Sequence, residues 1–471
     1  MSAVTDTLHY MHPDRWRRGT YVAFGSAVVV AVVTLVVAAA LWTDQHGHAV
    51  KPIGPPAPAA VTVAPGVVPV SADAPVPTAA GLANALAGPL ADTNLGALTG
   101  RVADAMTGTQ LWQQGADVPM QPASVNKTLT VAAALLALDR EDRLTTRVVA
   151  ADQNAQPGVI VLVGGGDTTL STAAPDEPTW YRGAARLSDL VNQVRRSGIK
   201  PTAVQVDTSL YSGPKMAPGW DPDDIEGGDV APMEPVMLDG GRVQPTSVES
   251  KRSLTPALDA GRALAAALGV DPNSVTTAPG PANGAELGSV QSAPLMSRLS
   301  ELMNASDNVM AESVAREVAV KLHKPASFSG GVDAVTSVLA DAGVDLKGAS
   351  LRDSSGLSVD DRLTATTLDD LMVVASGTEH PKLRPLLDLL PIAGGSGTLS
   401  DRFIDTGTRA SAGWLRAKTG SLTGTNTLAG VVTDRSGRVL TFAFLSNGGG
   451  PTGRVALDNL AAVLRTCGCG G

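Results

Sequence analysis

The chain has 471 residues, a net charge of −9 at pH 7 and only 3% aromatic side chains. This length allows a large core and more than one domain. Beyond the first 20 residues no stretch combines dense basic charge with aromatic residues, so the composition gives no reason to expect a nucleic-acid partner. With so few aromatic residues, the core must be built from Ala, Val and Leu.

The N-terminal region has the pattern of a membrane anchor. Tyr21–Trp42 contains no charged residue, and as a helix it would be about 33 Å long, enough to cross a bilayer. A cluster of arginines at residues 15–18 precedes it and Asp44 follows it. By the positive-inside rule, residues 1–20 are a cytoplasmic tail and the chain after 43 is extracytoplasmic. We therefore predict a single-pass cell-membrane protein anchored by residues 21–42, with a cleaved signal peptide as the alternative.

Two further segments lie outside the predicted folded part. Residues 43–80 are rich in Pro and Ala, which predicts an extended, semi-rigid linker. Cys467 and Cys469 are the only cysteines, so no disulfide framework is available. Two ligands in a frayed end make a poor metal site, and we predict neither a metal nor a cofactor.

The folded part begins with a predicted hairpin at Thr99–Gln113 and a helix at Gln121–Asp139. Val131–Leu138 is an unbroken apolar run, so this helix should be central and buried. Ser124 and Lys127, three residues apart at its start, share one face. If desolvation lowers the pKa of the lysine, it can take the serine proton and make the oxygen a nucleophile.

Residues 148–285 differ in character and are predicted to be a mainly β insertion. They contain strands at Gly158–Gly166 and Val204–Tyr211, and one clear helix at Pro256–Leu268. The glycine run lacks the following helix that a phosphate-binding loop requires. A second Ser-x-x-Lys, at Ser212–Lys215, contains Gly-Pro and so predicts a turn rather than a shared helical face.

The remainder returns to helices followed by strands. We predict two adjoining helices within Ser292–Val320, broken at Ala305–Asn308, and further elements in this order: a helix at Ala365–Ala375, strands at Gly413–Thr419, Thr425–Val432 and Val439–Ser446, and a helix at Ala456–Leu464. This succession predicts an α+β domain, with helices on both faces of an antiparallel sheet. Residues 81–147 and 286–466 would form it.

Three short motifs stand in order along this domain: Ser124-x-x-Lys127, Ser306-Asp307-Asn308 and Lys418-Thr419-Gly420. The first lies at a helix start, the second between helices and the third on an edge-like strand. In this order and these contexts, the chain resembles the D-alanyl-D-alanine carboxypeptidase/endopeptidase family of low-molecular-mass penicillin-binding proteins. The resemblance implies a β-lactamase/transpeptidase-like domain, interrupted by an insertion after the first motif.

Shorter stretches extend the resemblance over roughly residues 82–465. They are Leu162–Asp167, Asp207–Leu210, Asp239–Gly241, Asp353–Leu357, Leu390–Gly394 with Gly397–Leu399, and Arg416–Gly420. We interpret Asp353–Leu357 and Gly394–Leu399 as structural turns, because Gly, Ser and Asp are the usual residues of turns.

The resemblance also implies roles for individual residues. Ser124 would attack the carbonyl of the penultimate D-Ala and release the terminal D-Ala from an acyl-enzyme. Lys127 would be the base, kept neutral in part by Lys418, and Ser306 would relay a proton to the leaving amine. Peptidoglycan stem peptides would be the substrates and β-lactams the covalent inhibitors.

Substrate binding is implied for five residues. Asn308 would hold the substrate amide, Lys418 and Thr419 its carboxylate, and Gly420 would let its backbone approach the strand. The backbone N–H groups of Ser124 and Ser421 would form the oxyanion hole.

Two alternatives remain open at this point. A β-lactamase would need a carboxylate that activates water. Glu301 in Glu-Leu-Met-Asn is a candidate, although it lies directly before the second motif instead of in a separate loop. A catalytically silent wall-binding protein is the other alternative, although every reactive residue is present.

Overall fold

The computed structural model describes residues 73–467. The predicted cytoplasmic tail, the predicted anchor and residues 43–72 of the predicted linker lie outside the described residues. Within residues 73–467, no helix is long and apolar enough to cross a membrane. Cys469 also lies outside them, whereas Cys467 is disulfide-bonded and buried against the C-terminal helix, so the prediction of a frayed end is wrong for that residue.

The predicted peptidase domain carries the three motifs, is named the catalytic half below, and is built on a five-stranded antiparallel sheet. Its strand order is β10-β11-β12-β1-β2, and β1 pairs with β12, so the first strand of the fold lies beside the last. The bounds are β1 Ala97–Asp104, β2 Gln110–Gln114, β10 Leu415–Leu422, β11 Thr425–Thr433 and β12 Val439–Asn447. The predicted N-terminal hairpin and the three C-terminal strands are therefore confirmed, and β10 is an edge strand.

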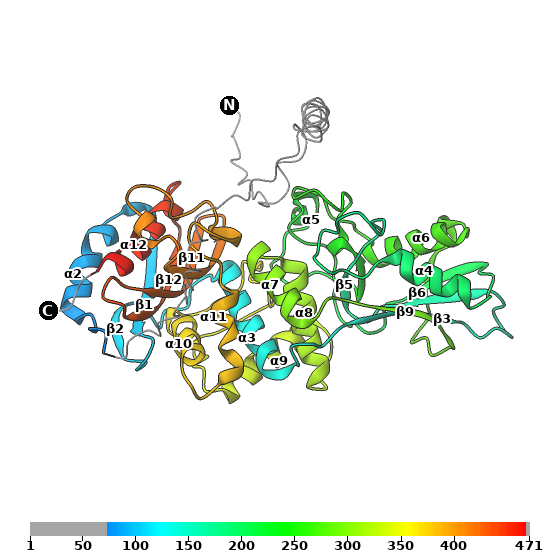
Figure 1. Cartoon of the computed structure of the whole chain (residues 1–471), viewed down its shortest axis with the longest axis horizontal. Helices are drawn as coiled ribbons and strands as arrows, with labels where there is room; N and C mark the ends of the chain where they lie inside the picture. Colours follow the sequence, from blue (N-terminus) through cyan, green and yellow to red (C-terminus); the bar gives the residue numbers. More distant parts are fainter. Residues whose placement is uncertain (1–72, 468–471) are drawn as a thin grey trace, which may run out of the picture. The chain divides into compact units, whose positions relative to one another are not determined.

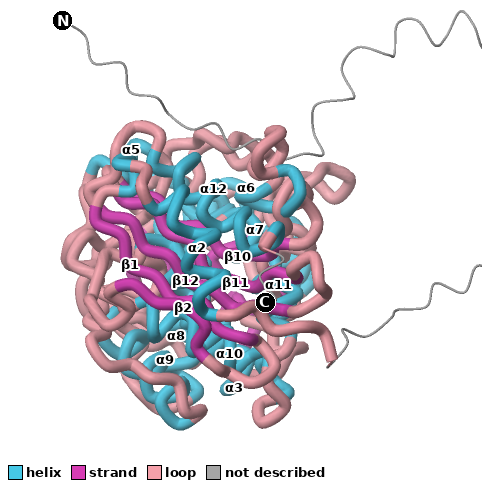
Figure 2. The backbone as a smooth tube through the Cα atoms, turned by 90° about the vertical axis from the view of Figure 1, so that its left-hand side faces the viewer, coloured by secondary structure: helices cyan, strands magenta, loops and turns pink. Residues whose placement is uncertain are grey.

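Helices cover both faces of this sheet (Figures 1 and 2). Along β12, Phe442 and Phe444 pack with α2 (Ala79–Leu90) and α12 (Gly453–Thr466), while Ala443 and Leu445 belong to the cluster of the opposite face. The alternation follows from the two-residue period of a strand. That opposite face is covered by helices of the chain's middle part, which include α3 (Lys127–Ala137) and α10 (Ala365–Ser376). The α+β prediction is confirmed.

The helix that carries the first motif begins later than predicted. Ala123–Asn126 form a 3-10 turn, and α3 starts only at Lys127. Ala123 has φ of +48°, a conformation that costs a non-glycine residue of order 1–3 kcal/mol. From Lys127 to Leu135 every residue of α3 is buried, which confirms the predicted central position.

The second motif lies where one helix ends and the next begins. α7 is Leu295–Ala305 and α8 is Asn308–Lys321, so the predicted break is confirmed. Ser306 has left-handed backbone angles, and Asp307 caps α8 by accepting a hydrogen bond from Met310 N–H (2.9 Å). After α8 come α9 Phe328–Asp341, α10, α11 Pro385–Leu389 and α12.

The inserted region forms a second five-stranded sheet, of order β8-β6-β4-β3-β9 (Figure 1). Its strands are β3 Thr145–Ala150, β4 Val159–Val163, β6 Ala203–Asp207, β8 Thr276–Thr277 and β9 Glu286–Gln291. β4, β6 and β8 run parallel, whereas β3 is antiparallel to both β4 and β9. Strand pairing thus includes residues just outside 148–285.

The helical content of this region exceeds the prediction. The predicted helix Pro256–Leu268 is confirmed as α6, but α4 (Leu187–Arg196) was missed and packs beside it on the same sheet. The short helix α5 (Asp223–Gly227), in an acidic segment, was missed as well. A two-stranded sheet, β5 Asp167–Leu170 with β7 Val236–Leu238, follows the glycine run.

Candidate active site

The first motif forms a direct contact between hydroxyl and amine. Lys127 Nζ lies 2.9 Å from Ser124 Oγ. The serine belongs to the 3-10 turn and the lysine to the first turn of α3, and the side chain of Lys127 is fully buried. This distance allows proton transfer without rearrangement.

Two further acceptors fix the amine. Asn308 Oδ1 lies 2.6 Å from Lys127 Nζ, and the backbone carbonyl of Ser355 lies 2.7 Å from it. A neutral amine has two N–H donors and one lone pair. If the two donors point at these acceptors, the lone pair is left facing the hydroxyl of Ser124, which is the arrangement that a general base requires.

Burial favours the neutral form of the Lys127 amine. It lowers the pKa of Lys127 to about 8, while the carboxylates of Asp353 and Asp307 act in the opposite direction. The pKa of Lys418 is also lowered, by burial first and by the charge on Lys127 second. The charge on Lys127 therefore disfavours a charge on Lys418, but burial is the larger influence on the pKa of each.

The second motif is held by the inserted region. Asp307 Oδ2 accepts a hydrogen bond from the hydroxyl of Tyr181 (2.7 Å), and the guanidinium of Arg242 lies 3.8 Å from it. Arg242 also donates to the oxygen of Tyr181 (3.0 Å). These buried contacts fix the turn that presents Ser306 and Asn308.

Asn308 contacts the inserted region directly. Its Nδ2 donates to the carbonyl of Asp229 (3.0 Å), while its Oδ1 accepts from Lys127. The side-chain amide therefore bridges the catalytic amine and the insertion. The predicted contact of Asn308 with a substrate amide would have to share or replace the bond to Asp229.

The third motif lies on the edge strand β10. Lys418 Nζ donates to Ser306 Oγ (2.8 Å), and Thr419 Oγ1 donates to Thr398 Oγ1 (2.8 Å). The N–H of Ala417 points away from β11, because it bonds to the carbonyl of Pro391 (3.0 Å). Since alternate residues of a strand point the same way, the N–H groups of Thr419 and Ser421 face the same open side.

Gly420 lies against the start of the Ser124 turn. A Cβ at this position would be 2.8 Å from the carbonyl oxygen of Pro122 and 2.9 Å from the backbone nitrogen of Ser124. Only glycine lets β10 approach this closely. The approach brings the N–H of Ser124 next to the strand that carries Ser421, as the predicted oxyanion hole requires.

Sequence reasoning missed several contributors. We interpreted Asp353–Leu357 as a structural turn, yet its Ser355 carbonyl contacts the catalytic amine. Asp353 holds this turn by accepting from Ser355 N–H, Gly356 N–H and the indole N–H of Trp220. The Gly394–Leu399 stretch likewise supplies Thr398 to the third motif. The contact between Lys127 and the Ser355 carbonyl joins residues 228 positions apart, so no local sequence pattern could reveal it.

The competing residues are placed elsewhere. Lys215 of the second Ser-x-x-Lys forms an ion pair with Glu234 (2.5 Å), and its side chain is 59% exposed. Glu301, the residue considered for a β-lactamase, lies on α7 and forms an ion pair with Arg182 (3.5 Å).

Family models match most of the chain. Residues 82–253 and 248–466 match the D-Ala-D-Ala carboxypeptidase 3 (S13) family. Residues 11–69 match a separate model, described as the N-terminal domain of proteins like carboxypeptidase Rv3627c.

Similar proteins include two from mycobacteria and one solved structure. The chain is 66% identical over 462 residues to carboxypeptidase DacB of Mycolicibacterium smegmatis, covering 98% of this chain and 100% of that protein. It is 62% identical over 461 residues to carboxypeptidase Rv3627c of Mycobacterium tuberculosis, with the same coverage. The structure of penicillin binding protein 4 (dacB) from Haemophilus influenzae has a TM-score of 0.62 at 24% identity, over 77% of this chain and 95% of that one. That likeness supports the fold. The family match over most of the chain and the two mycobacterial relatives identify the chain as a member of the D-Ala-D-Ala carboxypeptidase 3 (S13) family.

Proposed function

We propose that this protein removes the terminal D-Ala from peptidoglycan stem peptides through an acyl-enzyme on Ser124. One observation carries the proposal: the buried amine of Lys127 lies 2.9 Å from the Ser124 hydroxyl, with acceptors available for both of its N–H groups. Such a site can make a serine nucleophilic without a histidine.

The reaction proceeds in two halves. Lys127 takes the proton of Ser124 as the oxygen attacks the carbonyl of the penultimate D-Ala, and the amine of the terminal D-Ala leaves after protonation through Ser306. Water then attacks the ester, with the proton moving by the same groups in reverse. The N–H groups of Ser124 and Ser421 stabilise the oxyanion in both halves.

Lys418 and Thr419 recognise the free carboxylate at the substrate's end. A bound carboxylate places a negative charge beside Lys418 and so favours its ammonium form, which burial disfavours. A β-lactam, which carries a carboxylate near its reactive carbonyl, would acylate Ser124 by the same route.

The same proposal places the enzyme outside the cytoplasmic membrane, held by residues 21–42. The charge-free run and the arginines before it support this location. A reporter protein fused after Ala80 tests it. If only a reporter that functions in the cytoplasm were active at this position, the proposed extracytoplasmic location would be wrong.

The catalytic proposal is tested by labelling with a fluorescent penicillin and by release of D-Ala from a D-Ala-D-Ala peptide. We expect both in the wild type and neither in Ser124→Ala. Labelling of Ser124→Ala would place the nucleophile elsewhere, and no labelling of the wild type would favour a silent wall-binding protein. Rapid turnover of penicillin would favour a β-lactamase. Cross-linked muropeptides as a second substrate report endopeptidase cleavage.

A further inference from the structure

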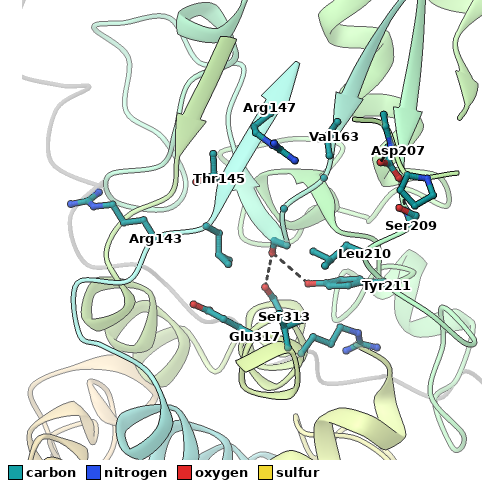
Figure 3. A pocket seen from close by; sticks show the side chains of 18 of the residues that line it. Arg143, Thr145, Arg147, Val163, Asp207, Ser209, Leu210, Tyr211, Ser313 and Glu317 are labelled. Carbon is teal, nitrogen blue, oxygen red and sulfur yellow. Dashed lines mark hydrogen bonds between the residues drawn. The ribbon is translucent and has the colours of Figure 1, made fainter. Parts of the chain in front are cut away.

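Two stretches that the catalytic site does not use meet at one pocket. Gly164–Gly166 follow β4, and Asp207–Tyr211 begin at the end of β6. Because β4 and β6 are parallel neighbours, their carboxyl ends open on the same crevice, the usual place for ligands in open sheets of this kind. Helix α8 of the catalytic half closes the other side (Figure 3).

The pocket encloses about 460 Å³, a volume in the range of small-ligand sites. Its walls are fixed by contacts between the two halves of the molecule. Ser313 Oγ of α8 donates to the carbonyl of Gly166 (2.7 Å), and the guanidinium of Arg316 lies 5.1 Å from the ring centre of Tyr211. Asp207 accepts hydrogen bonds from Ser209 N–H and Ala282 N–H, which hold two loops at the rim.

The lining combines unused polar groups with apolar walls. Among residues 73–467, the side chains of Arg147, Ser209 and Asn283 have no hydrogen-bond or ion-pair partner, although all three line the pocket. In Figure 3, Arg147 extends from β3 and Ser209 from the loop after β6, while Ser313 and Glu317 come from α8. Leu210 and Val320, also in the lining, are 37% and 45% exposed.

The charged side chains of the pocket indicate which charge its ligand carries. Glu317 is neutralised by Arg298, at 2.6 and 3.1 Å, and Arg316 is paired with Glu312 (3.2 Å). Asp207 is occupied by the two backbone N–H groups. Arg143 donates to the carbonyl of Ser292 (2.9 Å). The guanidinium of Arg147 is therefore the cation without a partner in this lining, and it favours a carboxylate.

We propose that this pocket binds a short, carboxylate-bearing peptide with small alkyl side chains, namely a second peptidoglycan stem peptide. Arg147 would pair with a carboxylate, Ser209 and Asn283 would bond to peptide groups, and the apolar walls would cover the alanine side chains. The identity of the peptide, though not the pocket chemistry, rests on the function proposed above. The site lies on α8, the helix that begins with Asn308, so an enzyme holding one strand there would act on another at Ser124.

Binding is measured by calorimetry on the purified full-length chain after acylation of Ser124 with penicillin, which closes the catalytic site. The probe is the tetrapeptide L-Ala-γ-D-Glu-L-Lys-D-Ala. We expect one equivalent to bind, and its form with all carboxylates amidated to bind at least tenfold more weakly.

Variants locate the bound peptide. Arg147→Gln should weaken binding at least tenfold, because a charge-assisted contact is lost. Ser209→Trp should abolish binding by filling the pocket, while the backbone bond to Asp207 remains. Arg196→Gln, an exposed arginine of α4 outside the lining, is the matched control and should bind like the wild type.

The outcomes separate the two proposals. No binding to the acylated protein, or equal binding by wild type, Arg147→Gln and Ser209→Trp, would overturn the pocket proposal. Failure of penicillin to acylate Ser124 would count against the proposed function alone, and the pocket would then be measured in Ser124→Ala.

Discussion

The two five-stranded sheets of this protein are covered to different extents. The catalytic sheet has a large apolar cluster on each face, so its helices enclose it from both sides. The inserted sheet has one large cluster, under α4 and α6. Within residues 73–467, the buried apolar cluster of its other face consists of Val149, Val161 and Val163, with a few partly buried neighbours. Charged side chains beside the catalytic sheet can therefore be buried, whereas those on the thinly covered face of the inserted sheet stay exposed to solvent.

This difference separates chemistry from recognition. In the catalytic half, the amines of Lys127 and Lys418 are fully buried, and burial is what lowers their pKa values. In the inserted half, Arg147 lies on the thinly covered face and keeps its side chain exposed. The inserted region also reaches into the catalytic half, through Tyr181 to Asp307 and through Trp220 to Asp353.

The sharpest test of the comparison uses the two Ser-x-x-Lys segments, one in each half. Lys127→Ala should slow acylation by a fluorescent penicillin by about 10²–10⁴-fold, because the general base is removed. Lys215→Ala is the matched control. It removes an exposed lysine paired with Glu234 and should leave the acylation rate unchanged. A larger loss in Lys215→Ala than in Lys127→Ala would reverse the assignment.

Lys418→Ala should separate binding from chemistry. The wild type should prefer a D-Ala-D-Ala peptide with a free carboxylate to its amide, since a charge-assisted contact is worth roughly 1.5–3 kcal/mol. In Lys418→Ala this preference, measured as the ratio of kcat/KM values, should shrink about tenfold or more. An unchanged ratio would mean that the carboxylate is bound by another group.

Tyr181→Phe removes one of the contacts between the halves through the loss of a single oxygen. Asp307 would lose its 2.7 Å hydrogen bond, and the turn bearing Ser306 would be less firmly held. We expect acylation to slow about tenfold, consistent with about 1–3 kcal/mol for a buried hydrogen bond. The rate is measured well below the unfolding temperature, so that a change in thermal stability alone leaves it unaffected. An unaltered rate would show that the insertion does not position the motif.

Glu312→Gln should give the smallest effect, a shift in pH dependence. The neutral amine is the base, so acylation rises as the pH passes the pKa of Lys127, about 8. The buried carboxylate of Glu312, which accepts from Ser354 N–H (2.7 Å), is one of the charges that raise that pKa. Its removal should therefore move the rise to lower pH.

The wild type and Glu312→Gln should converge at low pH. Burial, followed by the charge on Asp353, raises the pKa of Glu312 to about 7, so below that pH its charge is already lost in the wild type. Above pH 7 the two profiles of acylation rate should separate. A shift toward higher pH in Glu312→Gln would contradict the sign of this interaction.

Sequence patterns predicted the elements whose signals are local. The strands β10–β12 follow from apolar runs divided by turns, and the break at Ser306 follows from Ser-Asp-Asn between two helical patterns. The short helix α4 was missed among strand signals, although Leu187, Leu190, Val191 and Val194 carry a helical period.

The site shows the same limit. Spacing together with the helical context paired Ser124 with Lys127, because Ser212 and Lys215 share that spacing around a Gly-Pro turn. The family resemblance then grouped the pair with Ser306 and Lys418. The role of the Ser355 carbonyl could not be predicted, because every residue has a backbone carbonyl. The role of the buried Glu312 could not be predicted either, because no motif includes it. Their contacts also join residues 228 and 42 positions apart.

The partly covered edge of β10 limits the length of peptide that can pair with this strand. Leu415 and Ala417 are occupied by the segment around Pro391, through Ala393 N–H (2.9 Å) and the Pro391 carbonyl (3.0 Å). Among the described residues, no strand pairs with the outer side of β10 from Thr419 to Ser421. At about 3.3 Å per residue, this leaves roughly 10 Å for a guest strand, the span of a dipeptide and its flanking bonds. An enzyme that removes one terminal residue needs to bind only a dipeptide at this edge. The rest of a long peptidoglycan strand is then available to bind other surfaces of the protein.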